Sequence, residues 1–161
     1  MYNDKTTKTH DKTTKILFVC HGNICRSPMA EFIMADLVAK AGLAGRIAVA
    51  SAATSREEIG NDMYPPAKRC LTAHGVPFTR RSARQVTAAD YDAYDYLVIM
   101  DALNRRNLQR IIPSDPAGKI HTLLSFTGRD GVIDDPWYTD DFETAYRDIL
   151  RGCEALLQRL T

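Results

Sequence analysis

The feature that most constrains the fold is a short apolar run followed at once by a tight loop and the start of a helix. Ile16–Cys20 is continuously apolar, which is typical of a buried strand. Gly22 and Asn23 follow, and both residue types tolerate the backbone conformations of a tight loop. Ser27 then suits the cap of a helix and Pro28 its first position. This stretch therefore predicts a strand, a loop and a helix in immediate succession.

The alternation of strands and helices continues to the end of the chain. Apolar runs predict three further strands at residues 46–53, 96–100 and 119–124. Periodic apolar residues predict helices over 28–41, 65–74, 88–93, 102–111 and 142–160, with Gly42, Gly75 and Pro113 at or beyond their ends and Thr87 as a cap. Together they predict a single-domain α/β fold, a four-stranded parallel sheet flanked by helices on both faces, of the Rossmann-like or flavodoxin-like kind. Ligands of such sheets bind at the carboxyl ends of the strands, where Cys20 stands.

The composition limits the number of domains and the kinds of partner. The 161 residues suffice for one well-cored domain. Residues 1–14 hold no Val, Ile, Leu or Phe, so we expect a disordered polar tail before a domain over residues 15–161. The net charge of +1 supplies no long-range field for nucleic acid, and no apolar run suits a transmembrane helix or a secretory signal. We therefore expect a cytoplasmic protein with neither a nucleic-acid nor a membrane partner.

The loop after Cys20 has the residue types of an anion-binding site. Its backbone N–H groups can converge on an anion, and the positive end of the following helix dipole adds to the attraction. Arg26, six residues after Cys20, offers a planar fork that matches two phosphate oxygens. The same dipoles favour the thiolate form of Cys20, which is the nucleophilic form. The sequence thus indicates a cysteine nucleophile beside a bound phosphate.

Two other interpretations of this loop remain open on the residues alone. A Cys followed by an Arg six positions later often occurs by chance, and Cys20 and Cys25 can be buried, inert side chains. A Cys-x4-Cys half-site for a metal is disfavoured, because Cys70 and Cys153 have no paired neighbours to complete it. We interpret Cys70 and Cys153 as core residues and His74 as structural.

Two distant motifs and several shorter stretches carry a family likeness. The motifs are Val19-Cys-His-Gly-Asn-Ile-Cys-Arg-Ser-Pro28 and Asp134-Asp-Pro-Trp-Tyr138, and the shorter stretches are Ser51–Ser55, Ala83–Gln85, Met100–Asp101 with Asn104, and Asp141–Tyr146. With them the chain resembles the low-molecular-weight protein tyrosine phosphatases over about residues 15–160. The first motif is similar to the family's signature loop and the second to its general-acid loop. By this resemblance, residues 15–161 form a phosphotyrosine phosphatase-like catalytic domain.

The resemblance implies roles for the residues of the signature loop. Cys20 is then the nucleophile, Arg26 the phosphate clamp and Ser27 a hydrogen-bond donor to the thiolate. Asn23 fixes the loop conformation, and Asp101 supports Arg26. The other residues implied at the phosphate and substrate site are His21, Gly22, Ile24, Cys25, Trp137 and Tyr138, with Ser51 as a further support. We expect the side chain of His21 to point away from the phosphate, and Trp137 and Tyr138 to form an aromatic wall.

Asp135 is the candidate general acid. A phenolate is a poor leaving group and must be protonated as the P–O bond breaks. Pro136 holds Asp135 extended and can aim its side chain, although an Asp-Pro pair on its own more often begins a turn. The resemblance favours the acid, and the same carboxylate then activates water.

The resemblance further implies a redox role for Cys25 and a set of partners. A disulfide between Cys20 and Cys25 would protect the nucleophile from irreversible oxidation. The alternative interpretation is that Cys25 is only a small buried side chain. We expect phosphotyrosine-containing proteins as substrates, phosphate as the product, and a monomer or weak self-association. No metal or organic cofactor is expected.

The sequence departs from the family in two places, and two other functions compete. Arg56-Glu57-Glu58 replaces a loop that is often aromatic, and Arg80-Arg81-Ser82 stands where a histidine is common. An arsenate reductase shares a Cys-x5-Arg loop, but it needs a redox-active cysteine pair near residues 80–100, where this chain has none. A non-catalytic phosphotyrosine-binding module would need neither the nucleophile nor the acid.

Overall fold

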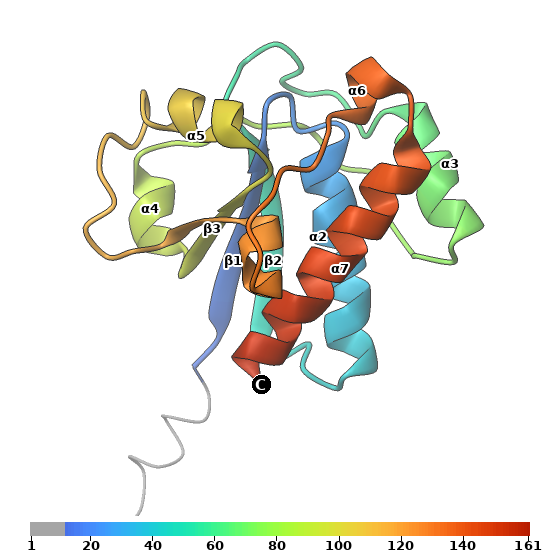
Figure 1. The fold of residues 1–161 in the computed structure, drawn as a ribbon, viewed down its shortest axis with the longest axis horizontal. Coiled ribbons are helices and arrows are strands. Elements are labelled where there is room, and N and C mark those ends of the chain that lie inside the picture. Colours follow the sequence, from blue (N-terminus) through green and yellow to red (C-terminus); the bar gives the residue numbers. More distant parts are fainter. Residues whose placement is uncertain (1–11) are drawn as a thin grey trace, which may run out of the picture.

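The computed structural model describes residues 12–161 and has one four-stranded parallel sheet with the strand order β2-β1-β3-β4 (Figure 1). The strands are β1 (Thr14–Cys20), β2 (Ile47–Ala53), β3 (Tyr96–Ile99) and β4 (Ile120–Thr122). The helices are α2 (Arg26–Lys40), α3 (Pro65–Ala73), α4 (Ala89–Ala93), α5 (Ala102–Leu108), α6 (Pro136–Thr139) and α7 (Phe142–Leu160), with a 3₁₀ helix η1 (Leu123–Thr127). The predicted α/β fold with a four-stranded parallel sheet is confirmed.

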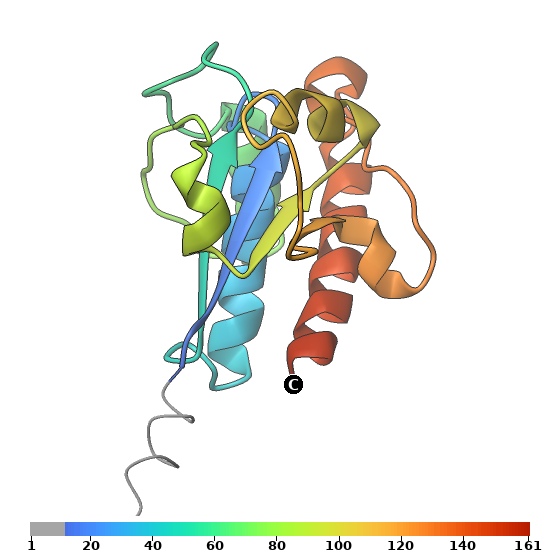
Figure 2. The ribbon, with the colours of Figure 1, turned by 90° about the vertical axis from the view of Figure 1, so that its left-hand side faces the viewer.

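The central strand β1 is fully buried because both faces of the sheet are covered. Alternate residues point to opposite faces, so Ile16 and Phe18 join the core beneath α2, α3 and α7, whereas Leu17 and Val19 face the core on the side of α5. Figures 1 and 2 show α2, α3 and α7 together on one side of the sheet, and α4 and α5 on the other. Short parallel strands connected by helices thereby bury a continuous apolar run.

The predicted caps were wrong at two helices. Helix α2 begins at Arg26 after an N-cap at Cys25, so Ser27 is already its second residue and turns its hydroxyl toward the preceding loop. Helix α4 has Ala88 as its N-cap, and the Asp90 carboxylate accepts a hydrogen bond from the Thr87 backbone N–H instead. Both residues were expected to be N-caps. Instead, Ser27 makes a hydrogen bond with the preceding loop, and Thr87 makes a local one with Asp90.

Two other predicted element ends differ from the structure by at least two residues, and one helix was not predicted. The strand expected over 119–124 ends at Thr122, and the chain continues as η1. The helix expected over 102–111 ends at Leu108, beyond which single turns lead to Pro113. The four-residue helix α6 was not predicted. Its start nevertheless has favourable residue types, because Asp135 is the N-cap and Pro136 the first helical residue.

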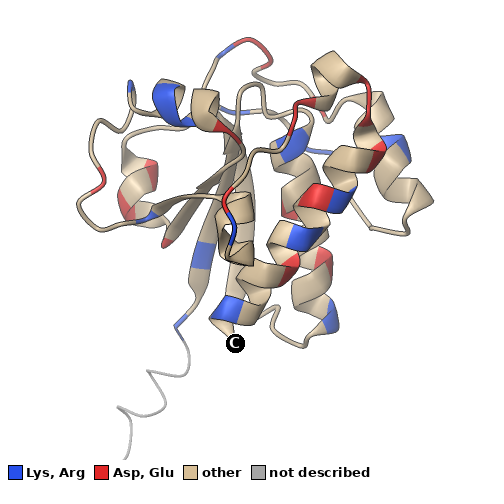
Figure 3. Cartoon of the chain, in the orientation of Figure 1, with Lys and Arg blue, Asp and Glu red and all other residues tan. Residues whose placement is uncertain are grey.

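The described part of the chain begins shortly before the predicted domain start. Strand β1 begins at Thr14, which pairs with Ile47, one residue before the predicted domain start. Most of the predicted tail, residues 1–11, lies outside the described residues. Within residues 12–161, no helix is both long and apolar enough to cross a membrane. Acidic and basic residues are interspersed over the helices and loops, as Figure 3 shows.

Loops from distant parts of the chain meet at the carboxyl end of β1. The backbone carbonyls of His21 and Ile24 accept hydrogen bonds from the backbone N–H groups of Ser55 and Tyr64 at 3.1 and 2.9 Å. The Ile133 N–H donates to the carbonyl of Met100, which follows β3, at 3.1 Å. These bonds fix the loop after β1 between the segment after β2 and the segment before α6.

Candidate active site

A pocket opens at the carboxyl end of β1. Its lining residues come from three segments: Cys20, His21, Gly22, Ile24 and Cys25 from the loop after β1, Glu57 and Glu58 from the segment after β2, and Asp135, Trp137 and Tyr138 around the start of α6. The structure therefore brings most of the sequence-predicted site residues to one place. Asn23, Arg26 and Ser27 lie directly beneath this pocket and are fully or almost fully buried.

Asn23 organises the loop from its centre. Its φ of 59° is left-handed, as the sequence predicted for an Asn in a tight loop. Its side-chain oxygen accepts hydrogen bonds from the Arg81 guanidinium and the Arg84 backbone N–H, which fixes the amide orientation. Its amide nitrogen must then donate, and it does so to the hydroxyl oxygens of Ser27 at 2.8 Å and Ser51 at 2.9 Å. Asn23 thus connects the loop to Ser27, Ser51, Arg81 and Arg84, and the roles expected of Asn23 and Ser51 stay predictions.

The same network includes the hydrogen bond between Ser27 and Cys20. Ser51 directs its own proton to the Glu31 carboxylate at 2.6 Å, and Ser27 accepts a proton from Asn23. The Cys20 thiol donates to the Ser27 oxygen at 3.0 Å, and the Ser27 hydroxyl proton can turn to the sulfur once Cys20 is a thiolate. A hydroxyl that donates to sulfur stabilises a thiolate there, and a hydrogen bond to a charged group is worth about 1.5–3 kcal/mol.

Arg26 is held rigidly, and one N–H of its guanidinium has no partner in the described part of the chain. It is only 2% exposed, and its Nη1 donates to Asp101 Oδ2 at 2.6 Å and to the Ile133 carbonyl at 2.7 Å. Nη2 lies 3.4 Å from Asp135 Oδ2, and Nε has no partner among residues 12–161. The Nε and Nη2 hydrogens therefore form an edge that can bind two oxygens of a tetrahedral anion.

Electrostatics keep the Arg26 side chain charged despite its burial. Burial alone lowers the pKa of Arg26, but the negative charges of Cys20, Asp135 and Asp101 together raise it above its usual value. A buried guanidinium needs such partners. A phosphate group can replace Asp135, which lies farther from Arg26 than Asp101 does. Arg26 is thus a permanent cation facing the thiol.

Asp135 reaches the pocket from the N-cap of α6. One carboxylate oxygen accepts a hydrogen bond from the Trp137 backbone N–H at 3.1 Å, and the other faces Arg26. Pro136 is the first residue of α6, which fits its fixed φ and its missing N–H. This cap aims the carboxyl group into the same pocket as the Cys20 thiol.

The rim of the pocket combines aromatic and acidic side chains. Trp137 and Tyr138 are 50% and 80% exposed, and Trp137 packs against Tyr64 with ring centroids 4.8 Å apart. His21 turns its Nε2 toward Glu57 Oε2 at 3.1 Å, away from the guanidinium edge. Glu57 and Glu58 therefore bring negative charge to the wall where the sequence suggested a departure from the family.

Cys25 lies in the same loop as a second, less reactive thiol. All four cysteines in the described part of the chain are free, and Cys25 is buried. Burial, with the nearby charge of Cys20, raises the pKa of the Cys25 thiol well above its usual range. Cys25 is therefore protonated at neutral pH, and its predicted disulfide with Cys20 stays a prediction.

Several residues that shape the site were not predicted from the sequence. They are Glu31, Tyr64, Arg81, Arg84 and the backbone carbonyl of Ile133. All of them act through contacts with segments far away in sequence. Two of them carried a signal: Arg81 lies in the charged stretch that replaces a common histidine, and Arg84 lies in the stretch Ala83–Gln85 that shares the family likeness.

The model of the family described as low molecular weight phosphotyrosine protein phosphatase matches residues 15–161. The chain belongs to this family. A low molecular weight protein-tyrosine-phosphatase of Bacillus subtilis, YfkJ, is 42% identical over 88% of this chain and 92% of its own. The human low molecular weight phosphotyrosine protein phosphatase is 40% identical over 91% of this chain and 96% of its own.

Solved structures of family members share the fold. The crystal structure of YfkJ has a TM-score of 0.88 at 39% identity and covers 92% of this chain and 95% of its own. A Drosophila protein described as an arginine phosphatase has a TM-score of 0.83 at 35% identity and covers 92% of this chain and 98% of its own. Proteins with this fold are thus described both as tyrosine phosphatases and as an arginine phosphatase. The fold therefore does not identify the substrate, which must be inferred from the site.

Proposed function

We propose that this protein-tyrosine-phosphatase hydrolyses phosphotyrosine side chains and small aryl phosphates through a phosphocysteine at Cys20. The observation that carries the proposal is a pocket lined by both the Cys20 thiol and the Asp135 carboxyl group, with the buried Arg26 guanidinium 3.4 Å from that carboxyl group. Exposed Trp137 and Tyr138 beside them suit a phenyl ring. A nucleophile and an acid in one pocket, with an anion clamp beside the acid, meet the needs of phosphate-ester cleavage.

In the first step, the Cys20 thiolate attacks phosphorus in line with the leaving group. A sulfur–phosphorus bond forms as the bond from phosphorus to the tyrosine oxygen breaks, and protonated Asp135 gives its proton to that oxygen. Arg26 and the loop N–H groups bind the equatorial oxygens, where the negative charge is concentrated. In a preorganised site this electrostatic stabilisation is the largest single contribution.

In the second step, water releases the phosphate. Asp135, now a carboxylate, accepts a proton as water attacks phosphorus, and Cys20 leaves as a thiolate. Ser27 stabilises the returning negative charge on sulfur through the hydrogen bond described above. One carboxyl group thus serves first as acid and then as base, and no cofactor takes part in either step.

Two alternatives are weaker on this chain. Arsenate reduction needs a further pair of redox-active cysteines, and the remaining cysteines, Cys70 and Cys153, lie on α3 and α7 outside the pocket. A pure binding module has no use for Asp135 as an acid.

The proposal is tested by measuring hydrolysis and phosphate-analogue binding in the same variants. Cys20→Ser should abolish turnover of phosphotyrosine peptides and of an aryl phosphate yet still bind vanadate or phosphate, because the hydroxyl is a far weaker nucleophile while Arg26 remains. Phosphoarginine peptides and arsenate serve as competing substrates. Substantial hydrolysis by Cys20→Ser, or faster turnover of phosphoarginine or arsenate than of phosphotyrosine by the wild type, would overturn the proposal.

The role of Asp135 is tested by its dependence on the leaving group. Asp135→Asn should lower the rate of phenol release in the first turnover by about 10²–10⁴-fold for poorly leaving phenols, and by much less for phenols that leave without protonation. Asp134→Asn is the matched control and should have a far milder effect. A loss by Asp135→Asn that is equal for all leaving groups would exclude this residue as the acid.

A further inference from the structure

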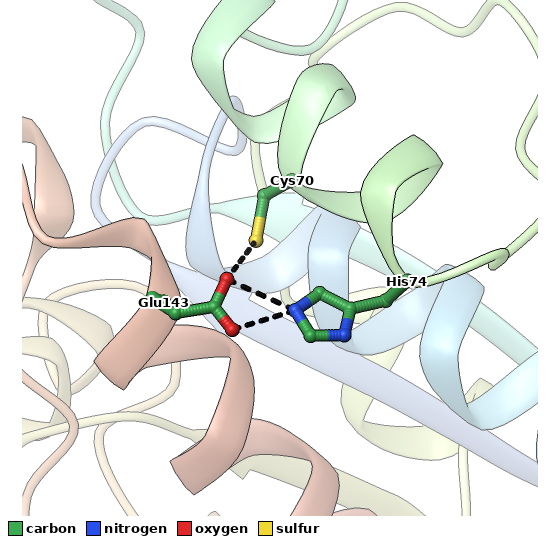
Figure 4. Close-up of side chains that lie close together, drawn as sticks. All are labelled: Cys70, His74 and Glu143. Carbon is green, nitrogen blue, oxygen red and sulfur yellow. Dashed lines mark hydrogen bonds and ion pairs between the residues drawn. The ribbon is translucent and has the colours of Figure 1, made fainter.

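A second cluster of reactive side chains lies outside the pocket, between α3 and the start of α7. Cys70 and His74 are four residues apart, so they lie on one face at the end of α3, and Glu143 reaches them from the first turn of α7 (Figure 4). The proposed phosphatase mechanism uses none of the three. From the sequence alone, Cys70 was interpreted as a core residue and His74 as a structural residue.

The distances within this cluster are close to those of a tetrahedral metal site. His74 Nε2 lies 2.7 and 2.9 Å from the two carboxylate oxygens of Glu143, and Cys70 Sγ lies 3.9 Å from the nearer oxygen. All three ligand atoms fall within 4.8 Å of one another. Bond lengths to Zn²⁺ of about 2.0–2.3 Å place tetrahedral ligand atoms about 3.3–3.6 Å apart. Changes of about half an ångström in the His74–Glu143 and Cys70–Glu143 distances, and of up to about 1 Å between the Cys70 sulfur and the His74 nitrogen, would therefore seat an ion.

The donor set selects the kind of cation. A thiolate, an imidazole and a carboxylate suit Zn²⁺ or a similar borderline transition metal, whereas Mg²⁺ and Ca²⁺ prefer oxygen ligands alone. The side chains of His74 and Glu143 are 30% and 54% exposed, so an ion can enter from solvent and a water molecule can take the fourth position. Three protein ligands with one open position is a common zinc arrangement.

The surroundings already hold the ligands in place. The His74 ring stacks on Tyr146 with centroids 3.7 Å apart and planes 9° apart, which fixes the direction of Nε2. The Cys70 thiol donates to the Phe142 carbonyl at 3.6 Å. We propose that Cys70, His74 and Glu143 form a binding site for Zn²⁺ or a similar divalent transition metal, which cross-links α3 to α7.

Binding exchanges protons for the cation. The thiol proton of Cys70 leaves as the sulfur–metal bond forms. The Nε2 proton that the Glu143 carboxylate accepts is released or moves to Nδ1, so that His74 binds through an unprotonated Nε2. Burial, with the charge of Glu143, raises the pKa of the Cys70 thiol to about 11, and a bound divalent cation reverses that balance by stabilising the thiolate. The cluster can therefore exist in two states: protonated and hydrogen-bonded without a metal, or deprotonated with a bound metal.

The location gives the site a connection to the catalytic pocket. Tyr64 immediately precedes α3, and it packs on Trp137 beside the acid and on Phe142 at the start of α7. An ion between α3 and α7 would stiffen the start of α7, which follows the segment that carries Asp135, and also α3, whose preceding residue Tyr64 packs on Trp137. We infer that metal binding raises the stability of this part of the fold without entering the chemistry.

The test uses Co²⁺ and Zn²⁺ as probes on protein from which the pocket thiols have been removed by Cys20→Ser and Cys25→Ser. Binding of one Co²⁺ should produce a thiolate-to-cobalt charge-transfer band and visible bands of tetrahedral intensity, and Zn²⁺ should displace it. Cys70→Ser in this background should abolish the charge-transfer band, whereas Cys153→Ala, which removes the remaining thiol, should leave it unchanged. Circular dichroism confirms that each variant is folded.

Two surface variants keep the test independent of the fold of Cys70→Ser. His74→Gln and Glu143→Gln should each weaken Zn²⁺ binding by at least 10- to 100-fold, the usual loss when even an indirect supporting residue is removed. Zn²⁺ should also raise the Tm of the background protein but not that of the Cys70→Ser variant. Absence of binding at micromolar metal, or binding that survives in all three variants, would overturn the proposal and leave a simple His74–Glu143 ion pair.

Discussion

Removal of the Ser27 hydroxyl should slow the second half of the catalytic cycle. Ser27→Ala deletes the hydroxyl 3.0 Å from the Cys20 sulfur, and that hydroxyl can donate a hydrogen bond to the sulfur when Cys20 is a thiolate. Negative charge returns to sulfur when the phosphocysteine is hydrolysed, so the lost hydrogen bond raises the barrier of this step. The first step, in which sulfur loses charge, is not slowed in the same way.

The size of the effect follows from the kind of hydrogen bond. A bond to a charged group is worth about 1.5–3 kcal/mol, which corresponds to a rate loss of roughly 10- to 150-fold at full charge. Because the charge on sulfur is incomplete in the transition state, the fall in kcat should lie in the lower part of this range. Ser27 is fully buried, so thermal unfolding must be measured to show that the variant stays folded.

Rapid-quench kinetics separate the two steps. In Ser27→Ala, the phenol should appear in a burst whose amplitude approaches one per protein, followed by a slow steady rate, because phosphocysteine accumulates. Ser51→Ala is the matched control, since it removes the other hydroxyl bonded to Asn23 and leaves the sulfur contact in place. A reduced kcat without a burst, or an equal loss in Ser51→Ala, would refute a direct effect on the leaving thiolate.

Three further predictions concern redox protection, substrate choice and stability. Mild peroxide should inactivate the enzyme reversibly and yield a peptide with a Cys20–Cys25 bond, and full thiol recovery of Cys25→Ser would contradict the protective role. Glu57→Tyr should raise kcat/KM for acidic phosphotyrosine peptides more than for a small aryl phosphate, by a modest factor that salt reduces, because rim charge pairs are worth about 0.2–1 kcal/mol. Equal, salt-independent ratios would place this loop away from the bound peptide. Gly152→Ala should destabilise the fold by about 1–3 kcal/mol in urea unfolding, since a Cβ there would lie 2.5 Å from the Cγ of Leu123, and unchanged stability would show that the contact relaxes.

The sequence predicted the strands and the long helices well because their signals are local. Helix α7 was expected over residues 142–160 and spans Phe142–Leu160, since its apolar face repeats over five turns. The run at 119–124 was less informative, because six residues cannot separate a short strand from the 3₁₀ helix that follows it. Local patterns thus determine element type more reliably than element ends.

The site was predictable where one segment supplies its residues. The loop from Cys20 to Ser27 has a recognisable pattern, and the left-handed Asn23 agrees with it. The cap assigned to Ser27 was wrong because the demand on its hydroxyl comes from Asn23 and Cys20, a tertiary effect that helix-start rules do not include. The contacts of Asn23 with Arg81 and of Ser51 with Glu31 join residues that are remote in sequence, so no local pattern could indicate them.

The most direct test of the mechanism is to trap the phosphate on the protein. Asp135→Asn lacks the base for the second step, so with p-nitrophenyl phosphate, whose phenol leaves without protonation, phosphocysteine should accumulate. Acid quenching after incubation with labelled substrate should give close to one phosphate per protein, located on Cys20 by peptide mapping. Continued turnover with no protein-bound phosphate, or label on a residue other than Cys20, would contradict the covalent mechanism.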